Sequence, residues 1–196
     1  IQSATLDDCP QVALLHRDHI GTGFLSSLGV KFLTLLYRYL VDHEILFVAR
    51  NGDEVLGFIS SSLDTSVMMK QFVRKKFFPV LPLLIRFAFS PAFFKKVFET
   101  LFSPKKAKES ASLDHAVPEL LSIVVAPDHR GGSVAHDLLS ALEDALRAAG
   151  HPTYKVIAGA ELTGANKFYL KQGFTLAGTL EVHDGEVSNI YLKDLG

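Results

Sequence analysis

Hydrophobic patterns divide the chain into alternating strands and helices. Short apolar runs and apolar–polar alternation predict strands at residues 1–6, 45–49, 54–60, 120–125, 154–160, 175–183 and 186–192. Apolar residues three or four positions apart predict a helix that begins near Pro10, a second over 24–41, a long one from Val134 that ends before Gly150, and a short one over 163–172, capped by Thr163. This order of elements predicts an α/β fold.

Two dipeptides mark tight connections between neighbouring strands. Asn51-Gly52 and Asp184-Gly185 each separate two predicted strands. Both pairs accept the positive φ angles that a two-residue hairpin turn requires. We therefore expect two antiparallel hairpins, one in the first half of the chain and one at its C-terminal end.

Composition and charge limit the classes of function. A chain of 196 residues, 48% of them hydrophobic, can bury a sizeable core, and we expect a single domain over 1–196. The formal net charge of −1 gives no reason to expect nucleic acid as the main partner. Cys9 is the only cysteine, which excludes an internal disulfide and a multi-cysteine metal site. We therefore expect a cytoplasmic protein without a metal, as a monomer or a homodimer.

Residues 65–110 differ from the rest of the chain in charge and aromatic content. From 65 to 109 there are ten basic and two acidic residues, a net charge of +8, and most of the phenylalanines fall there. Prolines and Arg86 interrupt the apolar runs, so we expect two or three short helices and no membrane-spanning one. Such a segment packs as a lid over a ligand pocket, buries its phenylalanines against the core with its lysines in solvent, or contacts the inner face of a membrane. A lid or internal packing is preferred over membrane contact.

The junction at 128–133 carries a chemical signal. It joins the predicted strand 120–125 to the helix from Val134 with the sequence Asp-His-Arg-Gly-Gly-Ser. A helix start presents unpaired backbone N–H groups and the positive end of the helix dipole, and glycines let an anion approach closely. The junction is neither a Walker loop nor a complete GxGxxG motif. From the residues alone it is either a phosphate site or a turn that only connects two elements.

Two stretches of the chain resemble motifs of the GNAT N-acetyltransferase superfamily. Residues 130–135, Arg-Gly-Gly-Ser-Val-Ala, resemble its acyl-CoA signature Arg/Gln-x-x-Gly-x-Gly/Ala, with Ser133 in place of the middle glycine. Residues 165–174 resemble its closing CoA-contact motif, although Leu162 stands where the family often has an asparagine. The second match is in register at Ala165, Phe168, Tyr169, Gly173 and Phe174.

This resemblance implies the fold in more detail. It implies a central mixed, mostly antiparallel sheet of about seven strands flanked by helices. Residues 65–110 would then form a helical insertion between strands 3 and 4. The early helices would lie beside the acceptor site.

The resemblance also implies acetyl-CoA as co-substrate and a role for particular residues. Backbone groups of the strand at 120–125 would hold the pantetheine arm and polarise the acetyl carbonyl, and the amides after Arg130 would hold the diphosphate. The residues expected to bind acetyl-CoA are Ile123, Val124, Val125, Arg130, Gly131, Gly132, Ser133, Val134, Ala135, Asn166 and Tyr169.

For the chemistry, the resemblance implies Tyr169 as general acid for the leaving thiolate and Glu119 as general base for the amine. Weaker candidates for the base are Asp114, His115 and His183. The residues expected to contact the acceptor are His19, Thr22 and Phe24, with His16 and Asp18 as further candidates.

The predicted function is therefore acetyl transfer from acetyl-CoA to a primary amine within a ternary complex. No nucleophile elbow and no HExxH occur in the sequence, so neither covalent hydrolysis nor a metal mechanism is indicated. The hydrophobic, basic insertion favours a small anionic acceptor such as an amino sugar. One alternative is a GNAT-like module that binds acyl-CoA, a membrane or a partner without turnover. The other is an acetyltransferase that acts on protein N-termini or lysines.

Overall fold

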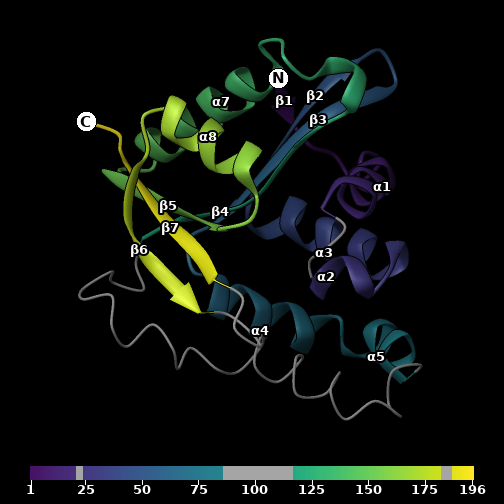
Figure 1. The fold of residues 1–196 in the computed structure, drawn as a ribbon. Coiled ribbons are helices and arrows are strands. Elements are labelled where there is room, and N and C mark those ends of the chain that lie inside the picture. Colours follow the sequence, from purple (N-terminus) through teal and green to yellow (C-terminus); the bar gives the residue numbers. More distant parts are fainter. Residues whose placement is uncertain (21–23, 86–116, 182–186) are drawn as a thin grey trace.

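One seven-stranded sheet organises the part of the chain that the computed structural model describes, which is residues 1–20, 24–85, 117–181 and 187–196 (Figure 1). Its order is β1-β2-β3-β4-β5-β7-β6, and every neighbouring pair is antiparallel except β4 and β5, which are parallel. The strands are β1 (Gln2–Ser3), β2 (Ile45–Asn51), β3 (Glu54–Ser62), β4 (Glu119–Val125), β5 (Thr153–Gly159), β6 (Thr175–Glu181) and β7 (Val187–Asp194). The predicted fold class, a mixed and mostly antiparallel sheet, is confirmed.

Helices cover both faces of this sheet (Figure 1). On one face, here called the α1–α5 face, lie α1 (Cys9–His19), α2 (Phe24–Ser27), α3 (Val30–His43), α4 (Thr65–Lys75) and α5 (Phe77–Ile85). On the other, the α7–α8 face, lie α7 (Val134–Ala148) and α8 (Thr163–Lys171), with a 3-10 turn, η1 (Pro127–His129), before α7. The helices α4 and α5 fall between strands β3 and β4, as predicted for the insertion. The rest of that segment, 86–110, lies outside the described residues.

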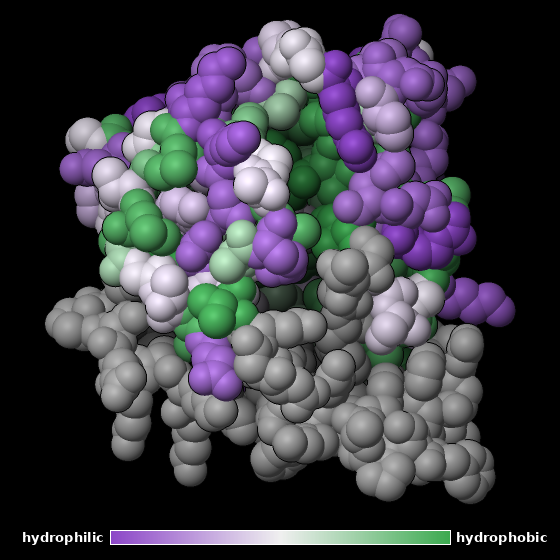
Figure 2. Space-filling view, viewed as in Figure 1, coloured by the Kyte–Doolittle hydropathy of each residue, from purple (hydrophilic) through white to green (hydrophobic). Residues whose placement is uncertain are grey.

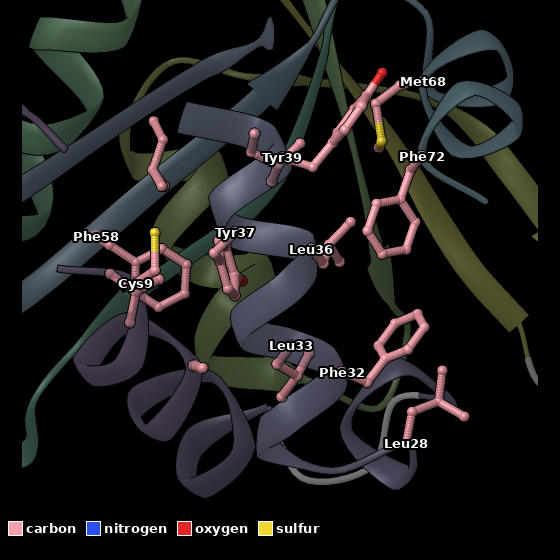
Figure 3. Packing of buried hydrophobic residues seen from close by; sticks show 14 of the residues in the cluster. Cys9, Leu28, Phe32, Leu33, Leu36, Tyr37, Tyr39, Phe58, Met68 and Phe72 are labelled. Atoms are coloured by element: carbon pink, nitrogen blue, oxygen red, sulfur yellow. The ribbon is translucent and has the colours of Figure 1, made fainter. Parts of the chain in front are cut away.

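The core of the α1–α5 face is built around α3. Its apolar positions repeat every three or four residues and point toward the sheet on one side and toward α4 on the other (Figure 3). Phe32 and Phe72 meet edge to face with their ring centroids 5.6 Å apart, which joins α3 to α4. Cys9 is fully buried in this core, and burial raises the pKa of its thiol to about 11. The thiol is therefore protonated and inaccessible.

The core of the α7–α8 face fixes α7 to the C-terminal strands through a buried carboxylate. Tyr154 of β5 donates a hydrogen bond to Glu143 Oε1 over 2.8 Å, and Lys193 Nζ of β7 lies 2.5 Å from the same oxygen. The guanidinium of Arg147 lies 3.6 Å from Glu143 Oε2. A buried charge is stable only when it is paired in this way. These bonds set where the N-terminus of α7 sits relative to the sheet.

Local signals explain most of the element boundaries. The side chain of Asp64 accepts a hydrogen bond from Val67 N–H over 2.9 Å and so caps α4. Gly52 in the β2–β3 turn has φ 59°, and Gly150 after α7 has φ 81°, which are conformations that glycine adopts without strain. The predicted hairpin at Asn51-Gly52 is confirmed. The predicted turn at Asp184-Gly185 lies outside the described residues, although β6 and β7 pair as an antiparallel hairpin should.

Three sequence expectations about these elements are wrong. The predicted helix over 24–41 is two helices, because Gly29 has φ 85° and separates α2 from α3. Thr163 does not cap α8, because its hydroxyl donates to the carbonyl of Glu161 instead, and α8 has no side-chain cap. The first strand is only Gln2–Ser3, since only these two residues pair with β2.

The buried carboxylate gives a stability prediction. Glu143→Ala should lower the free energy of unfolding by about 3 kcal/mol, because it leaves Tyr154 and Lys193 without their shared partner. Asp144→Ala on the same helix should change it by less than about 0.5 kcal/mol, since this side chain is 72% exposed and pairs only with Arg147. Urea unfolding of both variants tests this. Equal losses in the two would contradict a structural role for the buried carboxylate.

Candidate functional site

The site begins where strands β4 and β5 part. They pair only at Glu119–Lys155 and Leu120–Val156, and beyond these two positions no described residue pairs with β4 on its β5 side. On its other side β4 stays paired with β3 as far as Val125, and Ala126 N–H then donates to the carbonyl of Leu56. Since backbone bonds alternate in an antiparallel ladder, the N–H and C=O groups of Ile123 and Val125 point away from β3, toward the gap. The predicted backbone contacts to a ligand have their geometric basis here.

A β-bulge in β4 lies at the start of this gap. Ser60 of β3 faces Ser122, whereas Ser61 faces Leu120, so Leu121 has no partner across the strand pair. A bulge bends its strand and increases the local twist. The strand therefore turns away from β5 just beyond the last β4–β5 pair, and this bend opens the gap. The sequence analysis did not predict the bulge.

The turn after β4 has a conformation that only glycine adopts easily. Gly131 has φ 80°, and an added Cβ at either Gly131 or Gly132 would meet no atom closer than 3.8 Å. No neighbouring side chain therefore packs against these glycines, and their backbone is accessible to a ligand. Arg130 does not point away from the turn, because its Nε donates to the carbonyl of Val125 over 2.9 Å. The arginine thereby satisfies one of the backbone groups that face the gap.

The start of α7 offers a row of backbone donors. The first backbone bond of this helix runs from Asp137 N–H to Ser133 C=O, so the N–H groups of 131–136 have no partner among the described residues. The dipole of a 15-residue helix adds positive potential at this end. The hydroxyl of Ser133 is turned to the helix, where it donates to Asp137 Oδ2 over 2.7 Å. An anion at this turn would therefore meet main-chain donors rather than the serine side chain.

A cavity of about 420 Å³ connects the gap with the turn. It is lined by His19, Ile123, Val124, Val125, Arg130, Ala135, Gly164, Ala165, Phe168 and Tyr169. Figure 2 shows a hollow on this side of the molecule with hydrophobic residues on its floor and polar residues at its rim. Such a lining suits an extended ligand with an apolar arm and a few polar groups. Seven of the residues singled out from the sequence are brought together here.

The residues that the sequence analysis did not assign to the site come from α8. Gly164, Ala165 and Phe168 line the cavity beside Tyr169, so α8 forms one of its walls. The signal for them was present, because Ala165 and Phe168 belong to the stretch that resembles the closing GNAT motif. Residues that only shape a cavity wall carry no charged or reactive group. The sequence alone therefore does not identify them as site residues.

Tyr169 is buried at the cavity wall. Its ring packs against Phe168, Phe174 and Tyr191, and 6% of the residue is exposed. Burial raises the pKa of its phenol well above the usual value, so the group is protonated at neutral pH. Its hydroxyl has no hydrogen-bond partner among the described residues, which leaves the proton available to a ligand in the cavity.

Asn166 has a different position from its neighbours on α8. It is not among the cavity-lining residues, and its side chain donates to the carbonyls of Gly159 and Leu162 at 2.9 and 2.8 Å. Its amide oxygen accepts from Tyr191 and Asn189 of β7 at 2.8 and 2.9 Å. The side chain therefore holds the β5–α8 loop against β7 and supports the wall that carries Tyr169.

Glu119 lies at the closed end of the gap and does not line the cavity. Its Oε2 accepts from Thr65 Oγ1 over 3.1 Å and lies 3.8 Å from Lys155 Nζ. Burial raises the pKa of this carboxyl, and Lys155 and Thr65 oppose the increase. A carboxyl with a raised pKa is a better proton acceptor near neutral pH than an exposed one.

The residues proposed to contact the acceptor are only partly described. His19 lines the cavity, whereas His16, one turn earlier on α1, is buried and lies 2.6 Å from the hydroxyl of Tyr37. Asp18 is exposed and paired with Arg17. The structure does not describe Thr22, the side chain of Phe24, or the weaker base candidates Asp114, His115 and His183.

A comparison with protein families identifies the class. The model of the Acetyltransferase (GNAT) family matches residues 16–174, which include β4, the glycine turn, α7 and α8. The chain therefore belongs to the GNAT family of acetyltransferases. Among functionally curated proteins, none matches the sequence.

Solved structures with the same fold agree with this assignment. An N-acetyltransferase from Staphylococcus aureus Mu50 is 19% identical, with a TM-score of 0.63 over 100% of this chain and 97% of that one. The ribosomal-protein-alanine N-acetyltransferase from Brucella melitensis is 17% identical, with a TM-score of 0.62 over 98% of each chain. The structure of yncA from Salmonella typhimurium with its cofactor acetyl-CoA is 12% identical, with a TM-score of 0.57 over 100% of this chain and 92% of that one. At these identities the likeness is one of fold.

The burial of His16 predicts a pH dependence of stability. Burial lowers the pKa of His16 to about 4, so the unfolded chain, with a histidine pKa near 6.5, binds the proton more tightly. Stability should therefore fall as the pH drops from about 6.5 to about 4, by about 3 kcal/mol from this residue. Urea unfolding across this range, compared with His16→Gln, isolates the contribution.

A second variant separates burial from hydrogen bonding. Tyr37→Phe removes the partner of His16 but leaves the imidazole buried, so it should keep the loss of stability toward low pH. A His16→Gln protein with the same pH dependence as the parent would show that other groups cause it.

Proposed function

We propose that this protein transfers an acetyl group from acetyl-CoA to a primary amine, by direct transfer within a ternary complex. The observation that carries the proposal is the parting of β4 from β5 beside the open glycine turn at the start of α7. Along β4, backbone groups without a partner among the described residues lead to a cluster of such N–H donors at the start of α7. An acyl thioester with a diphosphate at its far end matches both parts.

The donor would be held largely by main chain. The N–H groups of 131–136, with the dipole of α7 behind them, suit the diphosphate of CoA. The backbone groups of Ile123 and Val125 suit the amides of the pantetheine arm, as a strand added to the edge of β4. Ala135 and Ala165 leave room for the arm between α7 and α8. The acetyl carbonyl would then lie where a β4 N–H polarises it.

Tyr169 is proposed as the general acid. Its protonated hydroxyl faces a cavity that also contains the free backbone groups of β4. As the amine attacks the carbonyl, the C–S bond breaks and the sulfur takes the electron pair, and the phenol donates its proton to that sulfur. The transfer moves the negative charge from sulfur to the phenolate oxygen, and the proton that leaves the amine restores the neutral tyrosine through water.

Glu119 is proposed to take the amine proton, directly or through water. It lies on β4 at the end of the gap, and Thr65 and Lys155 fix its carboxylate. His19 lines the cavity from α1, which supports an acceptor position between the early helices and β4. A small amine, such as an amino sugar, suits a cavity of this size. A protein N-terminus is the alternative acceptor, and the name of the Brucella neighbour offers that precedent.

Binding of the donor can be tested at the glycine turn. Gly132→Asp should weaken acetyl-CoA binding at least about 10-fold by calorimetry, because a carboxylate beside the free N–H groups repels a diphosphate. Gly132→Ala is the uncharged control and should weaken binding less than Gly132→Asp, since it adds only a methyl group that lies 3.8 Å from the nearest protein atom. S-acetylpantetheine, which lacks the diphosphate, should bind both variants alike. If calorimetry of the parent protein with acetyl-CoA showed no heat of binding, the proposal would be wrong.

Turnover can be tested at Tyr169. Tyr169→Phe should lower kcat by about 100-fold or more while acetyl-CoA still binds, because only the proton donor is lost. Release of free CoA with a panel of small amines and N-terminal peptides measures turnover and identifies the acceptor class. Tyr154→Phe is the control, since it removes a buried hydroxyl that bonds to Glu143 and does not line the cavity. Binding without CoA release in the parent protein would establish the acyl-CoA-binding alternative instead.

A further inference from the structure

The helices α4 and α5 expose large hydrophobic side chains that the core does not use. Phe77 is 48% exposed, Phe78 84% and Leu81 40%, and all three lie at the start of α5. Val80 on the same helix is buried in the core of the α1–α5 face. The helix therefore already has a packed side, and the exposed residues belong to its other side. Exposed, adjacent aromatic residues of this size usually mark a surface that binds something.

Positive charge precedes this apolar patch in the chain. The described part of the insertion, 65–85, contains Lys70, Arg74, Lys75 and Lys76 and no acidic residue. Lys75 lies 2.8 Å from a ring nitrogen of His43, whereas the other three side chains have no ion-pair partner among the described residues. The remainder of the chain outside 65–109 has a net charge of −9. The cations thus lie on α4 and at Lys76, directly before the exposed phenylalanines of α5 in the chain.

These helices lie apart from the cavity-lining helices α7 and α8. They lie on the α1–α5 face, away from α7 and α8 (Figure 1). None of the described helices is both long enough and apolar enough to cross a bilayer. An amphipathic helix with basic residues beside aromatic ones instead lies in the plane of the lipid headgroups.

We propose that α4 and α5 dock the protein on an anionic phospholipid bilayer, with Phe77, Phe78 and Leu81 inserted and Lys70, Arg74 and Lys76 on the headgroups. The charge complementarity selects a lipid surface of negative charge over a neutral one. A protein partner would need acidic groups matched to each cation, whereas a lipid surface supplies them at any position. Thr65 at the start of α4 bonds to Glu119 of β4, so the docked helices are joined directly to the sheet. The proposal does not depend on catalysis.

The experiment is co-sedimentation of the full chain with phosphatidylcholine vesicles and with vesicles that also contain phosphatidylglycerol. Binding should occur only to the anionic vesicles and should fall at least about 10-fold as the salt is raised from low to high concentration. Phe77→Ser with Phe78→Ser should lower the partition coefficient at least about 10-fold, and so should Lys70→Glu with Arg74→Glu.

Matched controls place the effect on this surface. Leu14→Ser removes an exposed apolar side chain on α1, 42% exposed, and Lys171→Glu reverses an exposed charge at the end of α8. Both should bind vesicles like the parent protein, and thermal melts of every variant establish that it is folded. Equal loss in the controls, binding to neutral vesicles alone, or no binding to either vesicle overturns the proposal. A parent protein that dimerises in solution through Phe77 and Phe78 would assign the surface to a second copy instead.

Discussion

The rest of this structure depends on the rule that backbone polar groups inside a protein need partners. Strand β4 loses β5 as a neighbour after two residue pairs, and Ile123 and Val125 then direct their backbone groups into a gap. Arg130 satisfies one of these groups, the carbonyl of Val125. The others remain for something that enters the gap. A sheet that would normally be continuous is thereby interrupted by a gap whose exposed polar groups belong to the main chain rather than to side chains.

The gap persists because the strands on either side are held independently. On one side β4 is fastened to β3 over most of its length, and on the other β5 is fastened to β7. Glu143 connects α7 to β5 and β7, and Asn166 connects the loop after β5 to β7. Neither strand can close the gap without breaking these bonds. The gap is therefore a fixed part of the fold, and a ligand that entered it would meet backbone groups already in position.

The sequence predicts the framework better than the site. Hydrophobic periodicity, Asn51-Gly52 and Gly150 suffice for most strands and helices, because local backbone preference and burial act together there. The bulge at Leu121 is not predictable, since it depends on the register between β3 and β4. The hydrogen-bond partners of Asn166 are not predictable either, because its bonds to Asn189 and Tyr191 join residues more than twenty positions apart. The cavity residues were found through their resemblance to family motifs, whereas their roles await measurement.

The break at Gly29 divides one predicted helix into two helices, α2 and α3. The core side chains of α3, such as Phe32 and Leu33, hold the α1–α5 face together and tolerate little change. The four-residue helix α2 precedes the break, and its position relative to α3 is set by a hinge that glycine permits (Figure 1). Leu25 of α2 nevertheless packs against the same core. The turn at Gly29 therefore lets the chain change direction before α3 while both helices stay anchored to one core.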